Sequence, residues 1–280
     1  MKIFVAKDAG YCFGVRDAVN LAYDTAKQYN SVYMLGDIVH NEKVVEDLEK
    51  VGTKVVKKLS DVPLDKPILL RAHGTPVNVW QQAKKENRKI IDATCPLVHD
   101  IHEEVKKLED EGRKIIIIGD HAHDEVVGIA SQVKKPIIIS NIKEAEDYRG
   151  IKMAGGVSQS TQSIENVQNI INILMTKVYD LHFINTICYP TKRNQEQIKD
   201  LAKNCDLMLI IGSFTSANSK RLTMLAKFIN KNTFQVTDKN ELKKKWFKNI
   251  ESVGISAGAS TPDYLIEEVK NEIEGYSYEQ

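Results

Sequence analysis

The stretch Asp92-Ala-Thr-Cys-Pro-Leu-Val-His99 joins a strand-like run to a long helical pattern. The apolar residues of 89–93 favour a strand. Pro96 favours the start of a helix, because the first helical position needs no N–H donor. Cys95 is therefore expected at a strand-to-helix corner, the place where helix N-termini direct backbone N–H groups at a ligand.

Two further cysteines lie at the same kind of corner, Cys188 in Thr186-Ile-Cys-Tyr-Pro190 and Cys12 in Gly10-Tyr-Cys-Phe-Gly14. Three thiolates match three irons of a [4Fe–4S] cluster, since thiolates are the usual cluster ligands. The fourth iron would keep an open position, which distinguishes a catalytic metal site from a structural one. Buried core cysteines are the alternative, and Cys205, which lacks such a corner, is expected to be one.

Strand and helix patterns alternate along the whole chain. The runs 115–118 and 207–211 are apolar on both faces, which is typical of strands covered on both sides, so we predict an α/β fold with mostly parallel sheets. Strands are expected over residues 2–6, 31–35, 67–72, 89–93, 114–119, 136–140, 152–158, 181–184, 206–212, 233–236 and 252–257. Helices are expected over residues 15–29, 42–50, 77–87, 96–111, 125–132, 161–175, 190–203, 217–229 and 262–273.

A coarse repeat of layout divides the chain into three parts. The chain has 280 residues, which is long for a single core, and each interval between the corner cysteines holds about one small α/β domain. We find no residue-level self-similarity between the intervals. Three similar units that each give one cysteine to a common centre are the simplest arrangement that uses all three cysteines.

Charge and composition exclude several classes of protein. Lys and Arg number 39 against 38 Asp and Glu, which gives a net charge of +1 and favours neither nucleic acid nor an anionic membrane as partner. The N-terminus reads as a strand without a signal-peptide core, and no apolar run approaches the roughly 20 residues that span a bilayer. We expect a cytoplasmic protein, whose four cysteines serve metal binding or catalysis rather than disulfides.

Polar side chains at other corners form a second set of candidates. His40, His73 and His123 follow strands or precede helices, and ligands bind at the carboxyl ends of strands in open α/β sheets. Hydroxyl and amide groups recur at the same places, as Ser160, Ser216, Asn218 and Ser260. Each could be only a helix cap, but together such donors could hold a diphosphate without lysines, and a Walker loop is absent.

The remaining histidines and one acid complete the candidates. Glu125 follows His123 closely and could supply a proton in a reductive dehydration, although an acid that opens a helix is also favoured by the helix dipole. His99 and His102 share one helix face, where surface or packing roles are expected, and structural roles are expected for His121 and His182.

Seven motifs, taken in order, resemble the IspH/LytB family of 4-hydroxy-3-methylbut-2-enyl diphosphate reductases. They are Gly10-Tyr-Cys-Phe-Gly-Val, His40-Asn-x-x-Val-Val, Ala72-His73-Gly74, Asp92-Ala-Thr-Cys-Pro-Leu-Val, His123-x-Glu125-Val-x-Gly, Thr186-Ile-Cys-Tyr and Gly258-Ala-Ser. The resemblance runs over nearly the whole chain. It implies a pseudo-threefold cloverleaf of three small α/β domains around a central iron–sulfur site. The domains would span residues 14–96, 97–190 and 191–280, with the N-terminal strand, within 1–13, joined to the third.

The resemblance also implies a role for each candidate. Cys12, Cys95 and Cys188 would ligate a [4Fe–4S] cluster with an open apical iron, and Glu125 and Ser160 would deliver protons. The residues expected to bind the diphosphate are His40, His73, His123, Ser160, Ser216, Asn218 and Ser260.

The implied reaction is the reductive dehydration of (E)-4-hydroxy-3-methylbut-2-enyl diphosphate to isopentenyl and dimethylallyl diphosphate, the last step of the non-mevalonate pathway. The partners would be this allylic diphosphate and an electron donor such as ferredoxin or flavodoxin, with no nucleic acid or membrane. Ser160 replaces a threonine common in the family, Ala217 a serine and Asn185 an aspartate. We expect these changes to alter rate or affinity rather than abolish activity.

Two other interpretations stay open at this point. A three-cysteine enzyme of the quinolinate synthase type would bind a dicarboxylate, and it predicts Arg or Lys at the corners where His, Ser and Asn stand. A redox or metal sensor without catalytic activity predicts a fourth tight ligand and gives the histidines and Glu125 no use.

Overall fold

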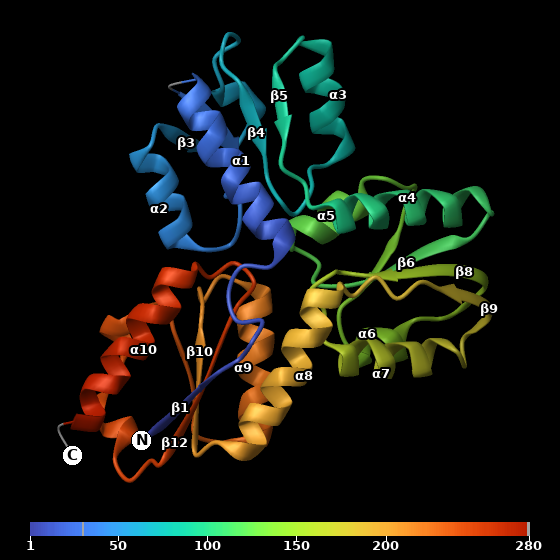
Figure 1. Ribbon diagram of the computed structural model, residues 1–280. Coiled ribbons are helices and arrows are strands. Elements are labelled where there is room, and N and C mark those ends of the chain that lie inside the picture. Colours follow the sequence, from blue (N-terminus) through green and yellow to red (C-terminus); the bar gives the residue numbers. More distant parts are fainter. Residues whose placement is uncertain (30, 279–280) are drawn as a thin grey trace. The chain divides into compact units, whose positions relative to one another are not determined.

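The computed structural model describes residues 1–29 and 31–278, in which strands and helices alternate (Figure 1). The strands are β1 (Lys2–Val5), β2 (Val32–Leu35), β3 (Thr53–Val56), β4 (Ile68–Leu70), β5 (Ile90–Asp92), β6 (Lys114–Ile118), β7 (Ile137–Ile139), β8 (Ile151–Ser158), β9 (Val178–Phe183), β10 (Leu207–Ile211), β11 (Thr233–Val236) and β12 (Ser252–Ala257). The α-helices are α1 (Phe13–Tyr29), α2 (Glu42–Lys50), α3 (Val77–Lys85), α4 (Pro96–Asp110), α5 (Asp124–Ala130), α6 (Ile142–Asp147), α7 (Ile164–Leu174), α8 (Tyr189–Asn204), α9 (Ala217–Ile229) and α10 (Asp263–Tyr278). The 3₁₀ helices are η1 (Leu59–Asp61), η2 (Lys239–Glu241) and η3 (Lys244–Phe247).

The strands of the described residues form three four-stranded sheets. The first has the order β3-β2-β4-β5, the second β7-β6-β8-β9 and the third β1-β12-β10-β11. Neighbouring strands are parallel in all of them, which confirms the predicted α/β class with three α/β parts. The domain boundaries and the arrangement around one centre stay predictions.

The third sheet takes one edge strand from the beginning of the chain. β1 pairs with β12 from Lys2 opposite Ser252 to Val5 opposite Ile255. Packing divides the described residues into two compact units. Unit 1, which holds the third sheet, comprises residues 1–16, 39–46 and 189 onwards, and unit 2, with the other two sheets, comprises 17–38 and 47–188.

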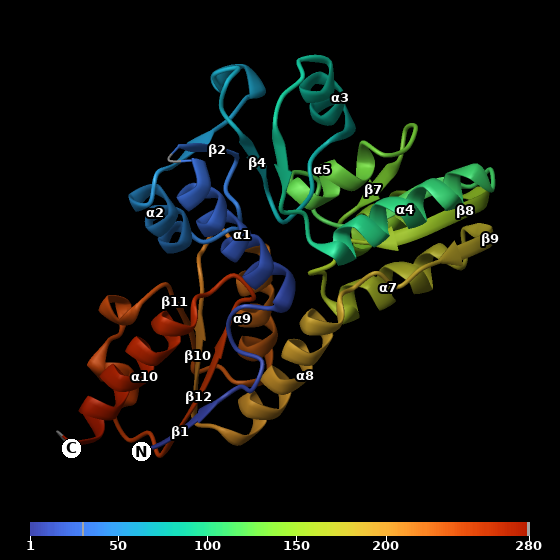
Figure 2. The ribbon, with the colours of Figure 1, turned by 45° about the horizontal axis from the view of Figure 1, so that its top comes forward.

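Strand β6 is covered by helices on both faces of the second sheet. Its alternate residues Ile116 and Ile118 pack against α6 and α7, while Ile115 and Ile117 pack against α4 and α5 (Figures 1 and 2). All four side chains are buried, and full burial of one such side chain contributes roughly 1.5–3 kcal/mol. The run of isoleucines therefore requires helices on both faces, as the sequence pattern predicts.

Strand β10 is likewise covered by helices on both faces of the third sheet. Leu207, Leu209 and Ile211 face α10 and η3, whereas Met208 and Ile210 face α8 and α9. Because helices cover both faces, the polar residues that follow each strand gather at the carboxyl edge of its sheet.

The sequence patterns missed one strand and one helix. They are β3 and α6, and α6 has six residues, fewer than two turns, which is too short for a helical period to be recognised. The expected helix at 161–175 begins later, at Ile164, because Ser163 is its cap and accepts a hydrogen bond from Asn166 N–H at 3.2 Å. Pro262 precedes α10 rather than opening it.

The helices of the described residues are too short or too polar to cross a lipid bilayer.

Candidate functional site

Glu125 and Ser160 form the centre of one group of predicted site residues in unit 2. The Glu125 side chain is 1% exposed, and its carboxylate accepts hydrogen bonds from the Ser160 N–H at 2.5 Å and the Ser160 hydroxyl at 2.8 Å. The Ser160 carbonyl in turn accepts the Cys188 N–H at 3.0 Å. Glu125, Ser160 and Cys188 are thus joined through the backbone and side chain of a single serine.

His123 extends this group at the start of α5. It is the N-cap residue, and its ring Nδ1 accepts the Glu125 N–H at 3.2 Å. That hydrogen bond requires an unprotonated Nδ1, so a neutral ring carries its proton on Nε2. The His73 ring stands edge-on to the His123 ring, with centroids 5.6 Å apart. The two histidines and the acid therefore converge from the carboxyl ends of β4 and β6.

Cys95 completes the group through the residue before His73. It is the N-cap residue of α4 with Pro96 at the first helical position, as predicted. Its N–H donates to the Ala72 carbonyl at 3.0 Å. We call Cys95, His73, His123, Glu125, Ser160 and Cys188 the Cys95–Cys188 cluster.

Unit 1 holds a second group, the Cys12 cluster, which consists of Cys12, His40, Ser216, Asn218 and Ser260. Cys12 immediately precedes α1, and its N–H donates to the Ala259 carbonyl at 3.3 Å. The next residue, Ser260, donates its hydroxyl to the His40 carbonyl at 3.1 Å. Cys12 and His40 are thereby attached to the same turn before α10.

The remaining members of the Cys12 cluster open α9. Ser216 is the N-cap residue and accepts the Ser219 N–H at 3.3 Å, and both Ser216 and Asn218 are buried. Ser213 and Thr215, in the same loop, donate their hydroxyls to Glu42 at 2.8 and 3.1 Å. Because Glu42 opens α2 two residues after His40, this contact joins the His40 segment to the α9 loop.

The pKa of Cys12 and the pKa of Glu42 are shifted in opposite directions. Burial raises the pKa of the Cys12 thiol, and the N–H groups of Val15 and Gly14, which point at the sulfur, offset only part of that rise. Burial also raises the pKa of Glu42, but its own N–H, the two hydroxyls and nearby His40 outweigh it, so the pKa is lowered. Amides that point at a sulfur favour a thiolate ligand.

The sequence patterns missed three residues that lie beside the two clusters. Glu42 was predicted only as part of a helix, and Arg71 and Asp124 were not singled out. Arg71 Nη1 lies 2.6 Å from Asp124 Oδ2, next to His73 and Glu125. The hydrogen bonds and the ion pair join segments far apart in the sequence, so no local pattern reveals them.

The other histidines and Cys205 lie outside both clusters. His102 is buried, and burial lowers its pKa to about 4. His99, His121 and His182 are exposed or half-buried and lie beside the carboxylates of Asp92, Glu144 and Glu111, while Cys205 belongs to the core on which α8 and α9 pack. Among the departures, Asn185 accepts the Ile187 N–H at 3.2 Å, a role that an aspartate would also fill.

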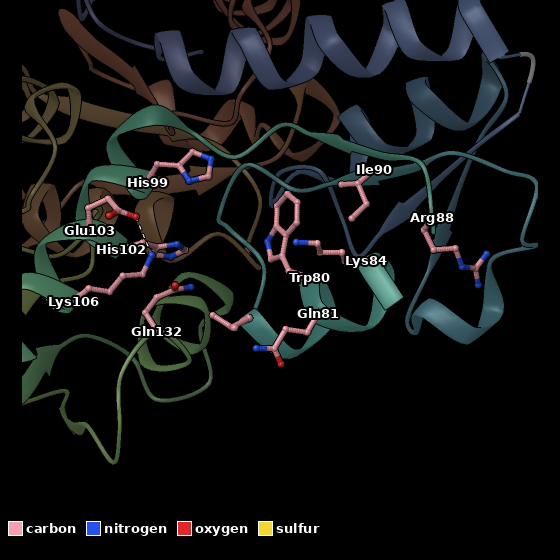
Figure 3. Close-up of a pocket in the computed structure, with 11 residues that line it drawn as sticks. Trp80, Gln81, Lys84, Arg88, Ile90, His99, His102, Glu103, Lys106 and Gln132 are labelled. Carbon is pink, nitrogen blue, oxygen red and sulfur yellow. Dashed lines mark hydrogen bonds and ion pairs between the residues drawn. The ribbon is translucent and has the colours of Figure 1, made fainter. Parts of the chain in front are cut away.

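A cavity of about 490 Å³ lies between α3 and α4, with Trp80, Lys84 and Lys106 among the residues that line it (Figure 3). Neither cluster contributes a residue to it.

The described residues contain no group of three or more His, Cys, Asp or Glu side chains arranged to hold a metal ion. Cys12 belongs to unit 1, and Cys95 and Cys188 belong to unit 2. The use of all three cysteines in one cluster therefore stays a prediction.

Fold and clusters together define an α/β protein of three parallel sheets. Its corner cysteines adjoin histidines, hydroxyls and a buried acid. The family model described as "LytB protein" matches residues 3–274, and the chain belongs to the LytB family. This is a family of iron–sulfur enzymes.

Curated relatives agree with this assignment. The chain is 37% identical over 275 residues to the 4-hydroxy-3-methylbut-2-enyl diphosphate reductase of Geotalea uraniireducens, which covers 98% of this chain and 97% of the relative. It is 36% identical over 277 residues to the enzyme of the same name from Aquifex aeolicus, which covers 97% of this chain and 96% of the relative.

Solved structures agree as well. The E-1-hydroxy-2-methyl-but-2-enyl-4-diphosphate reductase of Plasmodium falciparum superposes with a TM-score of 0.92 at 28% identity, over 98% of this chain and 87% of that chain. A structure of (E)-4-hydroxy-3-methyl-but-2-enyl diphosphate reductase, the terminal enzyme of the non-mevalonate pathway, gives a TM-score of 0.72 at 36% identity, over 98% of this chain and all of the other. The quinolinate synthase and sensor interpretations are therefore set aside.

Proposed function

We propose that this chain is an iron–sulfur reductase that converts (E)-4-hydroxy-3-methylbut-2-enyl diphosphate to isopentenyl and dimethylallyl diphosphate. The substrate gains two electrons and two protons and loses its hydroxyl as water. The observation that carries the proposal is the Cys95–Cys188 cluster, which joins a buried acid to two histidines and two cysteines within a chain of the LytB family.

The donor set fits an iron–sulfur cluster. Cys12, Cys95 and Cys188 each lie directly at the start of a helix and are half-buried, so their sulfur atoms are within reach of a ligand. In Cys12, backbone N–H groups already point at the sulfur. We propose that these three thiolates hold a [4Fe–4S] cluster with one iron left open, and that it supplies the electrons for the reduction when bound.

In this proposal most of the polar residues bind the diphosphate, and two others deliver protons. His40, His73, His123, Ser216, Asn218 and Ser260 bind the diphosphate, whose charge is met by neutral or protonated imidazoles and by hydroxyl and amide donors. Ser260 now donates its hydroxyl to the His40 carbonyl, so a diphosphate in reach would require that hydroxyl to rotate.

Proton delivery falls to Glu125 and Ser160. Their 2.8 Å hydrogen bond provides a path by which a proton can pass from the carboxyl through the hydroxyl to the substrate. Because the Glu125 side chain is almost fully buried, water does not compete for this proton. We further propose a cytoplasmic enzyme that receives electrons from a small redox protein such as ferredoxin or flavodoxin.

Anaerobic turnover tests the function. Protein with a reconstituted cluster is mixed with the hydroxylated diphosphate and a chemical reductant, and the two product isomers are separated by chromatography. We expect both isomers to form and the substrate to disappear in proportion. A preparation with full iron and sulfide content that leaves the substrate unchanged would overturn the proposal.

A further inference from the structure

An ion pair ties the first sheet to the second sheet beside the Cys95–Cys188 cluster. Arg71 follows β4 and Asp124 is the first residue of α5. Their Nη1 and Oδ2 atoms are 2.6 Å apart, and the side chains are 18% and 32% exposed. Breaking a partly buried pair of this kind leaves one charge uncompensated, which costs more than the loss of a surface pair.

Both partners adjoin residues that the proposed function uses. Arg71 lies two positions before His73, and Asp124 lies between His123 and Glu125. The carbonyl of the next residue, Ala72, accepts the Cys95 N–H at 3.0 Å. The backbone beside Arg71 is therefore attached to the cysteine corner, and the Arg71 side chain to the start of α5.

The Arg71 side chain occupies space that is free because residue 36 is a glycine. Gly36 has φ +77°, and a Cβ there would come within 2.8 Å of Arg71 Nη1. A side chain at position 36 would thus force the guanidinium to shift. A glycine at this position permits both the left-handed backbone and the close approach.

We infer that Arg71 and Asp124 are a positioning pair, which fixes the distance between the diphosphate-binding His73 and the proton-delivering Glu125. The inference rests on the proposed function. Neither residue needs to touch the substrate, because the pair acts through the two segments that it joins. Loss of the pair removes one of the contacts that hold the His73 loop against the start of α5, and a shift of about 1 Å can reduce a rate about 100-fold.

Arg71→Gln and Asp124→Asn test the pair by steady-state kinetics. Each is expected to lower kcat/KM about 10- to 100-fold, mostly through kcat, because the diphosphate keeps its other contacts while proton delivery depends on geometry. The double variant is expected to lose no more kcat/KM than the single variant that shows the smaller loss. Losses that multiply in the double variant, or wild-type kcat/KM in both single variants, would overturn the inference.

Arg88→Gln is the matched control. The Arg88 side chain is 3% exposed, pairs with Glu86 at 2.9 Å and donates to the carbonyls of Val62 and Pro63, remote from both clusters. This variant is expected to lower the melting temperature and to keep the wild-type kcat/KM. A loss of kcat/KM in Arg88→Gln equal to that in Arg71→Gln would reduce the pair to a general stabilising role and contradict the inference.

Histidine-ring NMR separates this inference from the proposed function, since it needs no turnover. The ring signals of His73 and His123 are assigned with asparagine variants and followed in protein without substrate. Arg71→Gln and Asp124→Asn change the local charge in opposite directions, so a purely electrostatic effect moves the signals in opposite directions. If both substitutions release the same contact between the His73 loop and α5, the ring signals move in the same direction in the two variants. This is the expected result, and shifts in opposite directions would overturn the inference.

Discussion

Ser160 donates two hydrogen bonds to Glu125, one from its backbone and one from its hydroxyl. The acid is fixed by the turn after β8, although its own helix follows β6, so its orientation depends on the packing of two neighbouring strands. The resemblance to the family leads us to expect threonine at this position, and serine keeps its hydroxyl. The departure at position 160 therefore preserves the contact and removes only a methyl group.

Glu125→Gln is expected to lower turnover by about 100-fold or more, because an amide cannot deliver the proton. Cluster content and affinity for the substrate should be unchanged. Glu144→Gln is the matched control, since Ser140 holds Glu144 in the same way, with its N–H at 2.8 Å and its hydroxyl at 2.7 Å, outside both clusters. Near-normal turnover in Glu125→Gln, measured with full cluster content, would rule out the acid role.

The candidate residues that the sequence patterns predicted are those that end strands or begin helices. Glu125 and Cys95 were predicted because a buried strand or a proline marks their position. Arg71 and Glu42 were not, because their importance comes from partners that lie 53 and 171 residues away and that only folding brings near.

Helix starts carry much of the site, and their caps show how far local chemistry can be predicted. Ser216 caps α9 as the sequence indicates. In the segment 158–163, several hydroxyl residues compete for the cap of α7, and the sequence alone does not select Ser163. That choice matters, because it leaves Ser160 available for Glu125.

Ser216→Ala and Ser163→Ala separate capping from binding. Both are expected to lower the free energy of unfolding by about 1 kcal/mol, as loss of a serine cap does. Ser216 accepts the cap hydrogen bond, so its own proton can be donated to a diphosphate. Ser216→Ala alone should therefore raise KM about 10-fold. Denaturant unfolding and steady-state kinetics check the two effects, and an unchanged KM would remove Ser216 from the binding set.

At the scale of the whole molecule, the number of sheets and their parallel strands follow from the alternation of apolar runs and amphipathic helices. An arrangement of the three parts about one centre does not follow from these patterns, and it stays a prediction from the resemblance to the family. The three corner cysteines are expected to act together in spite of their separation in sequence, and that expectation can be tested.

Cys95→Ser is expected to lose most of the iron and sulfide of the reconstituted protein, because two thiolates hold a cluster less well than three. Cys205→Ser should keep wild-type cluster content, since Cys205 is 7% exposed in the core and lies at no helix start. Metal analysis and the visible absorption spectrum measure both. Equal cluster content in the two variants would contradict a ligand role for Cys95.

The pairing of β1 with β12 has a consequence for biosynthesis. The ribosome makes Lys2–Val5 long before their partner strand, Ser252–Ile255, because most of the described chain lies between them. The third sheet cannot close before that partner strand emerges, whereas every strand of the other two sheets is already outside the tunnel. A nascent chain must therefore keep its opening segment unpaired throughout elongation, which exposes it to chaperones and to any neighbouring chain with an open sheet edge.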